Sequence, residues 1–346
     1  MVSLNIFNQD PFSTFELTAA VERIPHNPQI LGDMGIFEPF PIRTTALGIE
    51  ERTGVLNLIK TSQRGAPPST DRTTEQRKMR YFDTVRISHD DTIFASELQN
   101  IRAFGTETEL MQVQAEVARR LAGPTGLIPR IQYTWENMRL GAIQGILTDA
   151  DGSTLYNWFD EFQISQPAEQ VFNLAAQVVG SLRPLCNTVV RGMRRAAKGA
   201  FLPATQIIAL CGDTFWDDFI VHPDVVETYK NWVEAAELRG DWAFGTFYFG
   251  GITWINYRGS DDASTIAVAT NKVKFFPKGA PGIFRQVMAP GEAFEWVNTP
   301  GKEYYVIPIP DRERNTFWRM EAYSYPLFIC TRPEVLWSGT ADSTAD

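Results

Sequence analysis

Residues 267–337 constrain the fold of this chain most, because strand-forming runs alternate there with tight turns. Proline and glycine, which favour turns, stand between runs of β-branched and aromatic residues that favour strands. The stretch has no histidine and one cysteine, Cys330, so it lacks the side chains that most often perform catalysis. We interpret it as the framework of a structural protein that fits against other surfaces. The predicted strands are Ile266–Thr270, Lys272–Phe276, Tyr304–Ile309 and Tyr325–Cys330.

The composition allows a substantial core and argues against two classes of protein. Of 346 residues, 44% are hydrophobic and 12% aromatic, enough for two domains or for one domain with large excursions. The net charge of −9 argues against a sequence-specific DNA reader, which would more often be basic. No signal peptide is visible, and the most apolar run, 243–255, is too short to span a membrane. Because the three cysteines are widely spaced, we expect reduced, buried thiols in a soluble, unsecreted protein.

Residues 1–41 are predicted to form an arm. Apolar side chains are scattered through them without a sustained helical period, and Pro28, Pro39 and Pro41 disfavour helix at the preceding residues. Only residues 12–21 have the pattern of a short helix. Such a segment cannot bury its own apolar side chains, so it needs another surface to lie on.

Residues 42–88 carry an excess of positive charge. Nine lysines and arginines stand against five acids, which makes the segment +4 and leaves −13 for the rest of the chain. Strand-like pieces (Ile42–Leu47, Val55–Thr61 and Met79–Ile87) flank a polar tip at 62–76. The pattern favours a long solvated β-hairpin that reaches toward an acidic neighbour, and an ordinary surface loop is the alternative. The nine cations are Arg43, Arg52, Lys60, Arg64, Arg72, Arg77, Lys78, Arg80 and Arg86.

Helical periodicity is clearest from Thr106 to Ala122. Pro124 and Pro129 are expected to interrupt it before it resumes from Ile131 to Leu147, so we predict a long, broken helix. A turn at 149–152 would then close a hairpin. The later predicted elements are two helical runs in 167–198 split near 182–184, a buried strand Thr205–Cys211, helices from Phe215 and from Pro223 to Arg239, and strand-like residues Phe247–Tyr257. Helices and strands interleave, which predicts a mixed α+β fold.

The acidic residues give no catalytic pair. Adjacent side chains on a helix point about 100° apart, so Asp217 and Asp218 would not share a substrate as a general acid and base must. Asp213 is more simply the N-cap of the same helix. The enzyme alternative is a carbohydrate hydrolase that uses Asp217 or Glu292, but it lacks convergent carboxylates at a useful spacing.

Metal-binding, nucleophile and cofactor-binding motifs are missing as well. His26, His89 and His222 are far apart and stand at no metal-ligand spacing, and His222 is expected to be structural. There is no nucleophile elbow, phosphate-binding loop or dinucleotide fingerprint. We therefore expect no catalytic residue, no cofactor site and no metal site.

A second basic cluster lies further along the chain, with no acid between its ends and no interleaved aromatic platforms. We interpret it as a solvated helix face or an inter-subunit contact. Its members are Arg183, Arg191, Arg194, Arg195 and Lys198.

Three stretches of the chain resemble tailed-phage major capsid proteins of the lambda type, the major capsid protein E family. Residues 212–229 have its aromatic–Asp, His-Pro-x-Val and Tyr pattern. The second stretch joins Phe249-Gly-Gly-Ile252 and Tyr257-Arg-Gly259 to 276–284, and the third joins 289–292, 297–301 and 325–335. The likeness is close over 205–337 and weaker over 82–105, and the tip of the basic hairpin matches nothing in the family.

The resemblance implies the α+β tailed-phage major capsid fold. The parts implied are an N-terminal arm at 1–38, an extended β-hairpin loop at 39–90, a peripheral domain with a long spine helix at 91–165, an axial domain at 166–316, and a return strand of the peripheral domain with the C-terminal tail at 317–346.

The function implied is that of a major capsid protein, not an enzyme, that self-assembles into pentamers and hexamers. These would form the icosahedral shell around the double-stranded DNA of a tailed bacteriophage, without sequence-specific DNA binding and without a membrane. Expected partners are copies of itself and scaffold, portal and decoration proteins, with assembly in the host cytoplasm and residence in the virion. A phage decoration or tail protein is the alternative.

The charge asymmetry of the hairpin suggests specific contacts between subunits. We hypothesise that Arg64, Arg72, Arg77, Lys78 and Arg80 pair with acids of a neighbouring subunit. Candidate acids are Asp149 and Asp151, or Glu107 and Glu109.

Overall fold

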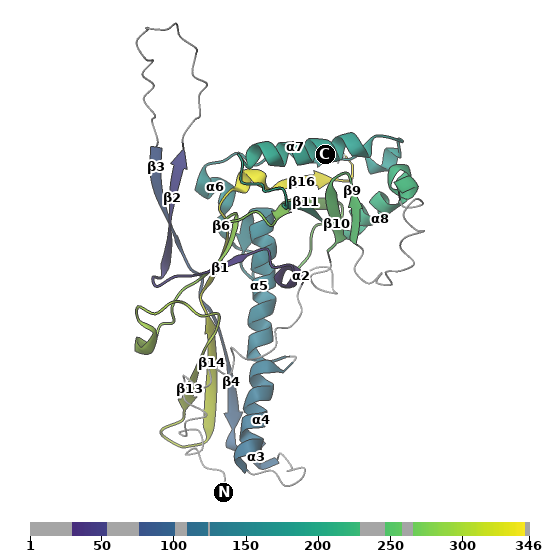
Figure 1. The fold of residues 1–346 in the computed structure, drawn as a ribbon. Coiled ribbons are helices and arrows are strands. Elements are labelled where there is room, and N and C mark those ends of the chain that lie inside the picture. The colour runs from purple at the N-terminus through teal and green to yellow at the C-terminus, as the bar shows by residue number, and fades with distance from the viewer. Residues whose placement is uncertain are drawn as a thin grey trace, which may run out of the picture.

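A long helical column, a six-stranded sheet at one end of it and a projecting hairpin define the architecture in Figure 1. The computed structural model describes residues 30–53, 76–100, 109–123, 125–228, 246–257 and 266–342. Helices and strands interleave along the chain, so the predicted α+β class is confirmed. The predicted helix at 12–21, the hairpin tip and most of the arm lie outside the described residues.

The column consists of helices α4 (Glu109–Ala122) and α5 (Leu127–Gln144). The predicted break is present, since α4 ends at Ala122 and α5 begins at Leu127, but Pro129 does not interrupt the second helix. It stands in the first turn of α5, where a missing N–H costs nothing. Helix α5 ends at Gly145, whose φ of 88° is left-handed and whose N–H bonds to the Gly141 carbonyl. Twelve of its 18 residues are buried, so α5 is a core element on almost all sides.

A three-stranded antiparallel sheet runs beside the column in the order β13–β14–β4. In β14, burial alternates strictly, because Trp318, Met320 and Ala322 face the core. The bounds are β4 Ile87–Phe94, β13 Tyr305–Pro310 and β14 Phe317–Ser324, and a short helix α3 (Ala95–Asn100) follows β4.

The six-stranded sheet has the order β7–β16–β11–β8–β10–β9. Its strands are β7 Gln170–Val171, β8 Gln206–Cys211, β9 Thr246–Phe249, β10 Ile252–Asn256, β11 Lys272–Lys278 and β16 Trp337–Thr340. Helices α7 (Leu182–Ala196) and α8 (Asp213–Val221), and the helical residues 223–228, pack their apolar side chains on one face. The other face joins the core around α5.

Smaller elements connect these parts. Strand β1 (Glu38–Pro41) pairs in parallel with β12 (Phe284–Met288), which pairs with β15 (Pro326–Cys330). The predicted hairpin after α5 is confirmed as β5 (Ile146–Thr148) and β6 (Thr154–Asn157). The basic hairpin is formed by β2 (Ala46–Thr53) and β3 (Gln76–Asp83). The remaining helices are α2 Ile30–Asp33, α6 Trp158–Phe162, η3 Leu174–Ala176, η4 Phe294–Trp296 and η5 Pro333–Val335.

Three predictions about secondary structure are wrong. Most of the predicted strand Ile42–Leu47 is irregular, because β1 ends at Pro41 and β2 begins only at Ala46. The first helical run of 167–198 is replaced by β7 and η3, because 170–171 pair with β16 and both Asn173 and Gln177 adopt positive φ angles. Tertiary pairing overrides helix propensity there. Residues 266–270 form no strand, because the Thr270 carbonyl accepts the N–H of Phe215 and so caps the start of α8.

Asp213 is also not the cap of α8. Gly212 occupies the N-cap position without a side-chain hydrogen bond, and Asp213 is the first helical residue. A Cβ at position 212 would lie 2.2 Å from the Ala269 carbonyl oxygen, so only glycine fits the close approach of the 269–270 backbone.

Candidate inter-subunit contact surfaces

The two faces of β3 differ in character. Side chains alternate along a strand, so Arg80 and Phe82 share one face while Met79 and Tyr81 lie on the other. Phe82 is buried against the rings of Trp158 and other aromatic residues of the β6–α6 segment. This packing anchors the base of the hairpin to its own subunit.

Two of the predicted contact residues bind the C-terminal end of α6. The Arg80 guanidinium donates to the carbonyl oxygens of Glu161 and Phe162, and it also stacks over the Phe162 ring. Lys78 Nζ donates to Gln163 Oε1 at 3.1 Å. Cations are favourable at a helix C-terminus because the carbonyl groups there are unpaired. Arg80 and Lys78 therefore fix the direction in which the hairpin leaves the subunit.

The outer face of the hairpin is exposed. Arg77 Nε lies 3.8 Å from Glu50 Oε1 on the paired strand. Met79 and Tyr81 are more than half exposed and lie over Gly48. Arg64 and Arg72 lie outside the described residues, so their predicted contacts stay predictions.

Of the predicted acidic partners, Asp149 and Asp151 lie in the turn between β5 and β6, Glu109 is the first residue of α4, and Glu107 lies outside the described residues. The Asp151 carboxylate accepts hydrogen bonds from both the N–H and the hydroxyl of Ser153, and these bonds lower the pKa of Asp151. The Asp149 carboxylate accepts the N–H of Ala150. Both acids hold the turn of their own chain, and their pairing with the hairpin of a neighbour stays a prediction.

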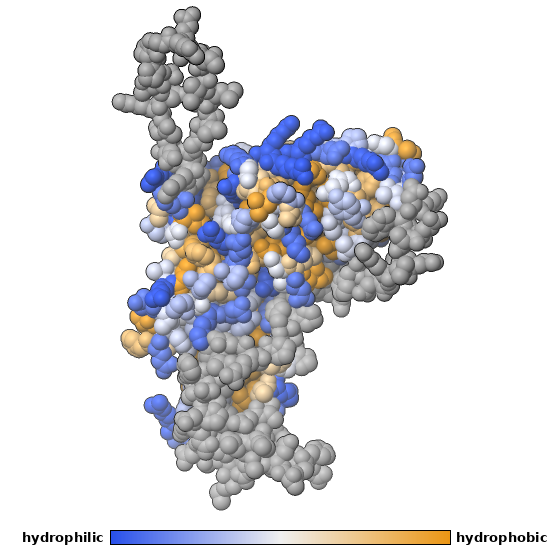
Figure 2. Space-filling model, viewed as in Figure 1, coloured by the Kyte–Doolittle hydropathy of each residue, from blue (hydrophilic) through white to orange (hydrophobic). Residues whose placement is uncertain are grey.

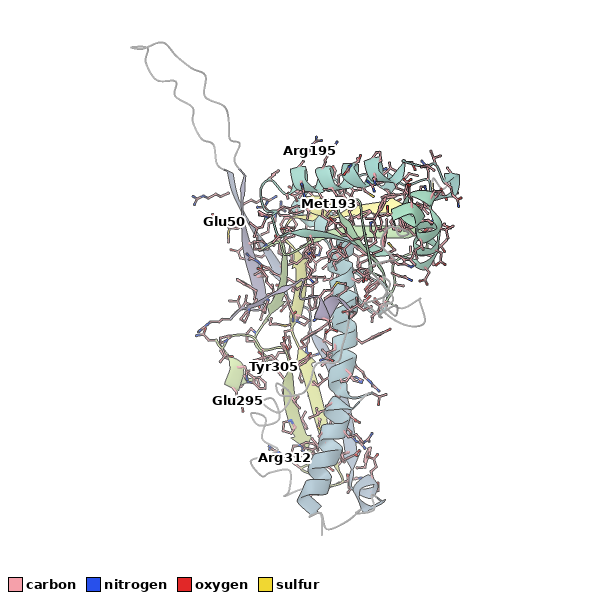
Figure 3. All side chains as sticks on the ribbon, turned by 45° about the vertical axis from the view of Figure 1, so that its right-hand side comes forward. Glu50, Met193, Arg195, Glu295, Tyr305 and Arg312 are labelled. Atoms are coloured by element: carbon pink, nitrogen blue, oxygen red, sulfur yellow. The ribbon has the colours of Figure 1, made fainter. Side chains whose placement is uncertain are left out.

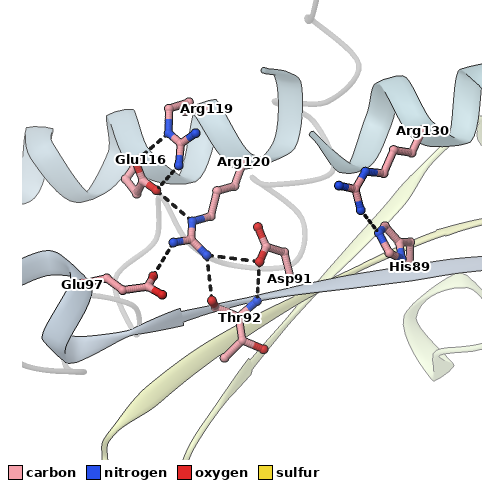
Figure 4. Close-up of polar contacts among 8 residues, drawn as sticks. All are labelled: His89, Asp91, Thr92, Glu97, Glu116, Arg119, Arg120 and Arg130. Carbon is pink, nitrogen blue, oxygen red and sulfur yellow. Dashed lines mark hydrogen bonds and ion pairs between the residues drawn. The ribbon is translucent and has the colours of Figure 1, made fainter. Parts of the chain in front are cut away.

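A network centred on Arg120 holds α4 against β4 and α3 (Figure 4). Its guanidinium contacts Glu116 Oε1 at 2.8 Å, Asp91 Oδ1 at 3.1 Å and the Thr92 carbonyl oxygen at 2.7 Å, and it also pairs with Glu97. Arg120 is largely buried, so these charge-assisted bonds are stronger than surface ion pairs.

Glu116 makes the α4 network sensitive to acid. Hydrogen bonds from Arg119, together with those from Arg120, lower the pKa of Glu116 to about 2. Because this is below its unfolded value, the stabilisation is complete at neutral pH and is lost as the pH falls from about 4.5 towards 2.

Glu116→Gln is expected to lower the free energy of unfolding at pH 7 by about 1.5–3 kcal/mol, the range for hydrogen bonds to charged groups. The difference from the wild-type chain should shrink strongly by pH 3. Urea unfolding at both pH values measures it, with Asp217→Asn on the exposed surface of α8 as the control. An equal difference at the two pH values would contradict this explanation.

The two histidines in the described residues, His89 and His222, bond to neighbours within the chain. His89 Nε2 lies 2.6 Å from Arg130 NH1, so the ring nitrogen accepts from the guanidinium (Figure 4). His222 is buried, its Nδ1 accepts the N–H of Asp224 at 3.3 Å, and burial lowers its pKa. His26 lies outside the described residues. Within the described ranges, no three His, Cys, Asp or Glu side chains are grouped to hold a metal ion.

The other candidate side chains do not converge on a catalytic centre. Asp217 and Asp218 are exposed on α8, and Glu292 Oε1 pairs with Arg86 Nε at 3.0 Å. All three cysteines are free and buried, as predicted, and burial raises the pKa of Cys186 to about 12. No helix in the described part of the chain is both long and apolar enough to cross a membrane.

Comparison with known proteins gives a consistent result. Residues 13–341 match the profile of the family described as phage major capsid protein E. The major capsid protein of Pseudomonas phage KPP10 is 26% identical over 359 residues, which cover 96% of this chain and 98% of that protein.

Solved structures show the same fold. A protein described as a proposed prophage capsid protein of E. coli CFT073 has a TM-score of 0.54 at 13% identity, and 95% of this chain and 99% of that one are covered. The mature capsid of bacteriophage PhiM1 has a TM-score of 0.51 at 11% identity, with 92% and 89% covered. The predicted tailed-phage capsid fold is therefore confirmed.

Proposed function

We propose that this chain, a member of the phage major capsid protein E family that acts as a phage major capsid protein, self-assembles into pentamers and hexamers. These capsomers close into an icosahedral shell around the double-stranded DNA of a tailed bacteriophage. The observation that carries the proposal is the family match over almost the whole chain, residues 13–341. In this proposal, assembly neither makes nor breaks a covalent bond. Many modest contacts, repeated around a closed shell, give the assembly its stability.

Assembly in the host cytoplasm and residence in the virion shell follow from this function. Scaffold, portal and decoration proteins are the proposed additional partners, and DNA is enclosed without sequence-specific contacts. Size-exclusion chromatography and electron microscopy of the purified protein test the proposal. Capsomers or closed particles are expected, whereas small assemblies that form only on preformed shells would favour a decoration protein.

The proposed domain boundaries can be refined from the strand pairing. Because β14 pairs with β4, the chain returns near residue 317 to the proposed peripheral domain. Because β16 pairs with β11, we propose that Trp337–Thr340 belongs with the axial domain. The arm at 1–38 and the extended loop at 39–90 keep their proposed roles as contacts with other subunits.

The hairpin tip is proposed to contact a neighbouring subunit. We expect Arg64→Glu with Arg72→Glu to leave a folded subunit that no longer forms shells, because the tip would repel the acidic surface it reaches. Circular dichroism measures folding, and electron microscopy measures assembly.

Arg80 requires a separate experiment, because it bonds within its own chain. Arg80→Ala should lower the stability of the subunit, since Arg80 holds the end of α6.

Normal shells from the variant that carries Arg64→Glu and Arg72→Glu would contradict the proposed role of the hairpin tip.

A further inference from the structure

Two consecutive segments of the proposed axial domain carry opposite charge. Residues 170–212 contain five lysines and arginines and no acid, whereas residues 213–228 contain five acids and no lysine or arginine. The first segment is therefore +5 and the second is −5, and the uncharged residues 199–212 separate Lys198, the last cation, from Asp213, the first acid. Both segments lie wholly within the described residues.

The positive charges form a basic face on and just beyond α7, made by Arg183, Arg191, Arg194, Arg195 and Lys198. All five are exposed, while Cys186, Val189 and Met193 on the opposite side of α7 are fully buried. Figure 3 shows Arg195 directed away from the sheet and Met193 toward it, and Figure 2 shows hydrophilic side chains projecting along α7.

The orientation of the basic face is fixed by packing. A Cβ at position 192 would lie 2.2 Å from the Trp337 ring, so α7 lies directly on β16 and has no room to rotate. Its N-terminus is held by Asp224, whose carboxylate accepts the N–H groups of Gly180 at 2.6 Å and Leu182 at 3.1 Å. The cations are therefore presented in a preorganised arrangement.

The negative charges form an acidic surface made by Asp217, Asp218 and Glu227, all exposed. These residues lie on α8 and the helical residues that follow it, at the end of the sheet away from the β2–β3 hairpin (Figure 1). Among the described residues, no ion pair joins the acidic surface to the basic face. Within the described residues, the charges of the two surfaces are therefore not neutralised by each other, although Arg183 also stacks over the Phe249 ring at 5.8 Å.

We propose that the basic face of one subunit docks on the acidic surface of the next copy of this chain within a capsomer. Two different, complementary patches on one chain are what a head-to-tail ring requires. Opposite charges across such a contact also fix the register and suppress wrong pairings. A DNA duplex would use only the basic face and would be repelled by the acidic surface beside it, so a second copy fits both observations. The inference rests on the proposed self-assembly.

Charge reversal tests the contact. One variant carries Arg191→Glu, Arg194→Glu and Arg195→Glu, and the second carries Asp217→Lys, Asp218→Lys and Glu227→Lys. Each alone should remain folded by circular dichroism but lose the capsomer peak in size-exclusion chromatography with light scattering. The chain that carries all six substitutions has complementary patches again, so it should recover capsomers, and it controls for damage to the fold.

Mixing the two triple variants gives a sharper result. One variant has two acidic patches and the other has two basic patches, so they can form only alternating rings. The mixture should therefore give hexamers and no pentamers in native mass spectrometry.

Two results would overturn the inference: capsomers from either triple variant alone, or no capsomers from both the mixture and the six-residue variant. The proposed function would remain intact in either case, provided that the wild-type chain assembles. Normal assembly of the first variant with loss of binding to a double-stranded DNA fragment would overturn it in favour of a phosphate-binding face. A wild-type chain that forms neither capsomers nor shells would overturn the proposed function and this inference together.

Discussion

Glu136→Ala is expected to lower the free energy of unfolding of the subunit by about 3–5 kcal/mol, the usual cost of removing one partner from a buried ion pair. Glu136 lies in α5 with only 2% of its surface exposed. Its Oε1 accepts the N–H of Leu31 at 2.9 Å and the hydroxyl of Tyr257 at 3.2 Å, and its Oε2 lies 3.5 Å from Arg139 NH1. Alanine would leave these donors, including a buried guanidinium, without this acceptor.

The network around Glu136 joins three distant parts of the chain. Leu31 belongs to α2, which precedes β1, and Tyr257 follows β10 of the six-stranded sheet. Burial raises the pKa of Tyr257, so its hydroxyl remains a donor. Loss of Glu136 should therefore loosen the sheet and the segment before β1 from the α5 column at the same time.

Urea unfolding of the unassembled subunit measures the effect, and a double-mutant cycle identifies its cause. Glu136→Ala with Arg139→Met should be less destabilising than Glu136→Ala alone, because the second substitution removes the uncompensated charge. Glu136→Gln is the matched variant, since it keeps the size and an acceptor oxygen. Additive effects in the cycle, or a cost below about 1 kcal/mol for Glu136→Ala, would refute the role of the pair.

Local patterns in the sequence were sufficient for much of the fold. The alternation and turn signals correctly predicted β8, the strand-like residues that form β9 and β10, and the strands around β11, β13 and β15. They failed at 266–270, where the pattern is strand-like but the backbone bonds to the start of α8. Hydrogen bonding to a distant element is not encoded in the local alternation of side chains.

The contact residues show the same limit. The charge count of the hairpin singled out Arg80 and Lys78 but did not reveal that they bind the end of α6, more than 80 residues away. No sequence pattern distinguishes Glu136, because it is one acid in a helical run and its hydrogen-bond partners are 105 and 121 residues away. By contrast, the basic face of α7 was visible in the sequence, since its acid-free composition requires no knowledge of the fold.

Trp254→Ala is expected to lower the free energy of unfolding by about 3–5 kcal/mol, because it leaves a cavity in the aromatic cluster between the six-stranded sheet and helices α7 and α8. Trp254 in β10 is fully buried. Its ring stacks on Phe219 at 4.3 Å and meets Phe172 and Phe275 edge-on at 5.9 and 5.5 Å between centroids. Its Nε1 donates to the Phe249 carbonyl oxygen at 3.0 Å, so alanine would also remove the partner of a buried acceptor.

The loss of stability should affect α7 and α8, which carry the basic face and the acidic surface. The aromatic cluster around Trp254 holds both helices to the sheet. Near-UV circular dichroism and urea unfolding measure it, with Tyr248→Ala on the adjacent strand β9 as the control. Tyr248 is 60% exposed, so its removal should change the stability by no more than about 0.5 kcal/mol. Trp254→Phe should fall between the two, because it keeps most of the ring but not the bond to Phe249. If Trp254→Ala and Tyr248→Ala lowered the free energy of unfolding by equally small amounts, the aromatic cluster would not be the core that positions α7 and α8. The fixed orientation of the basic face would then need another cause.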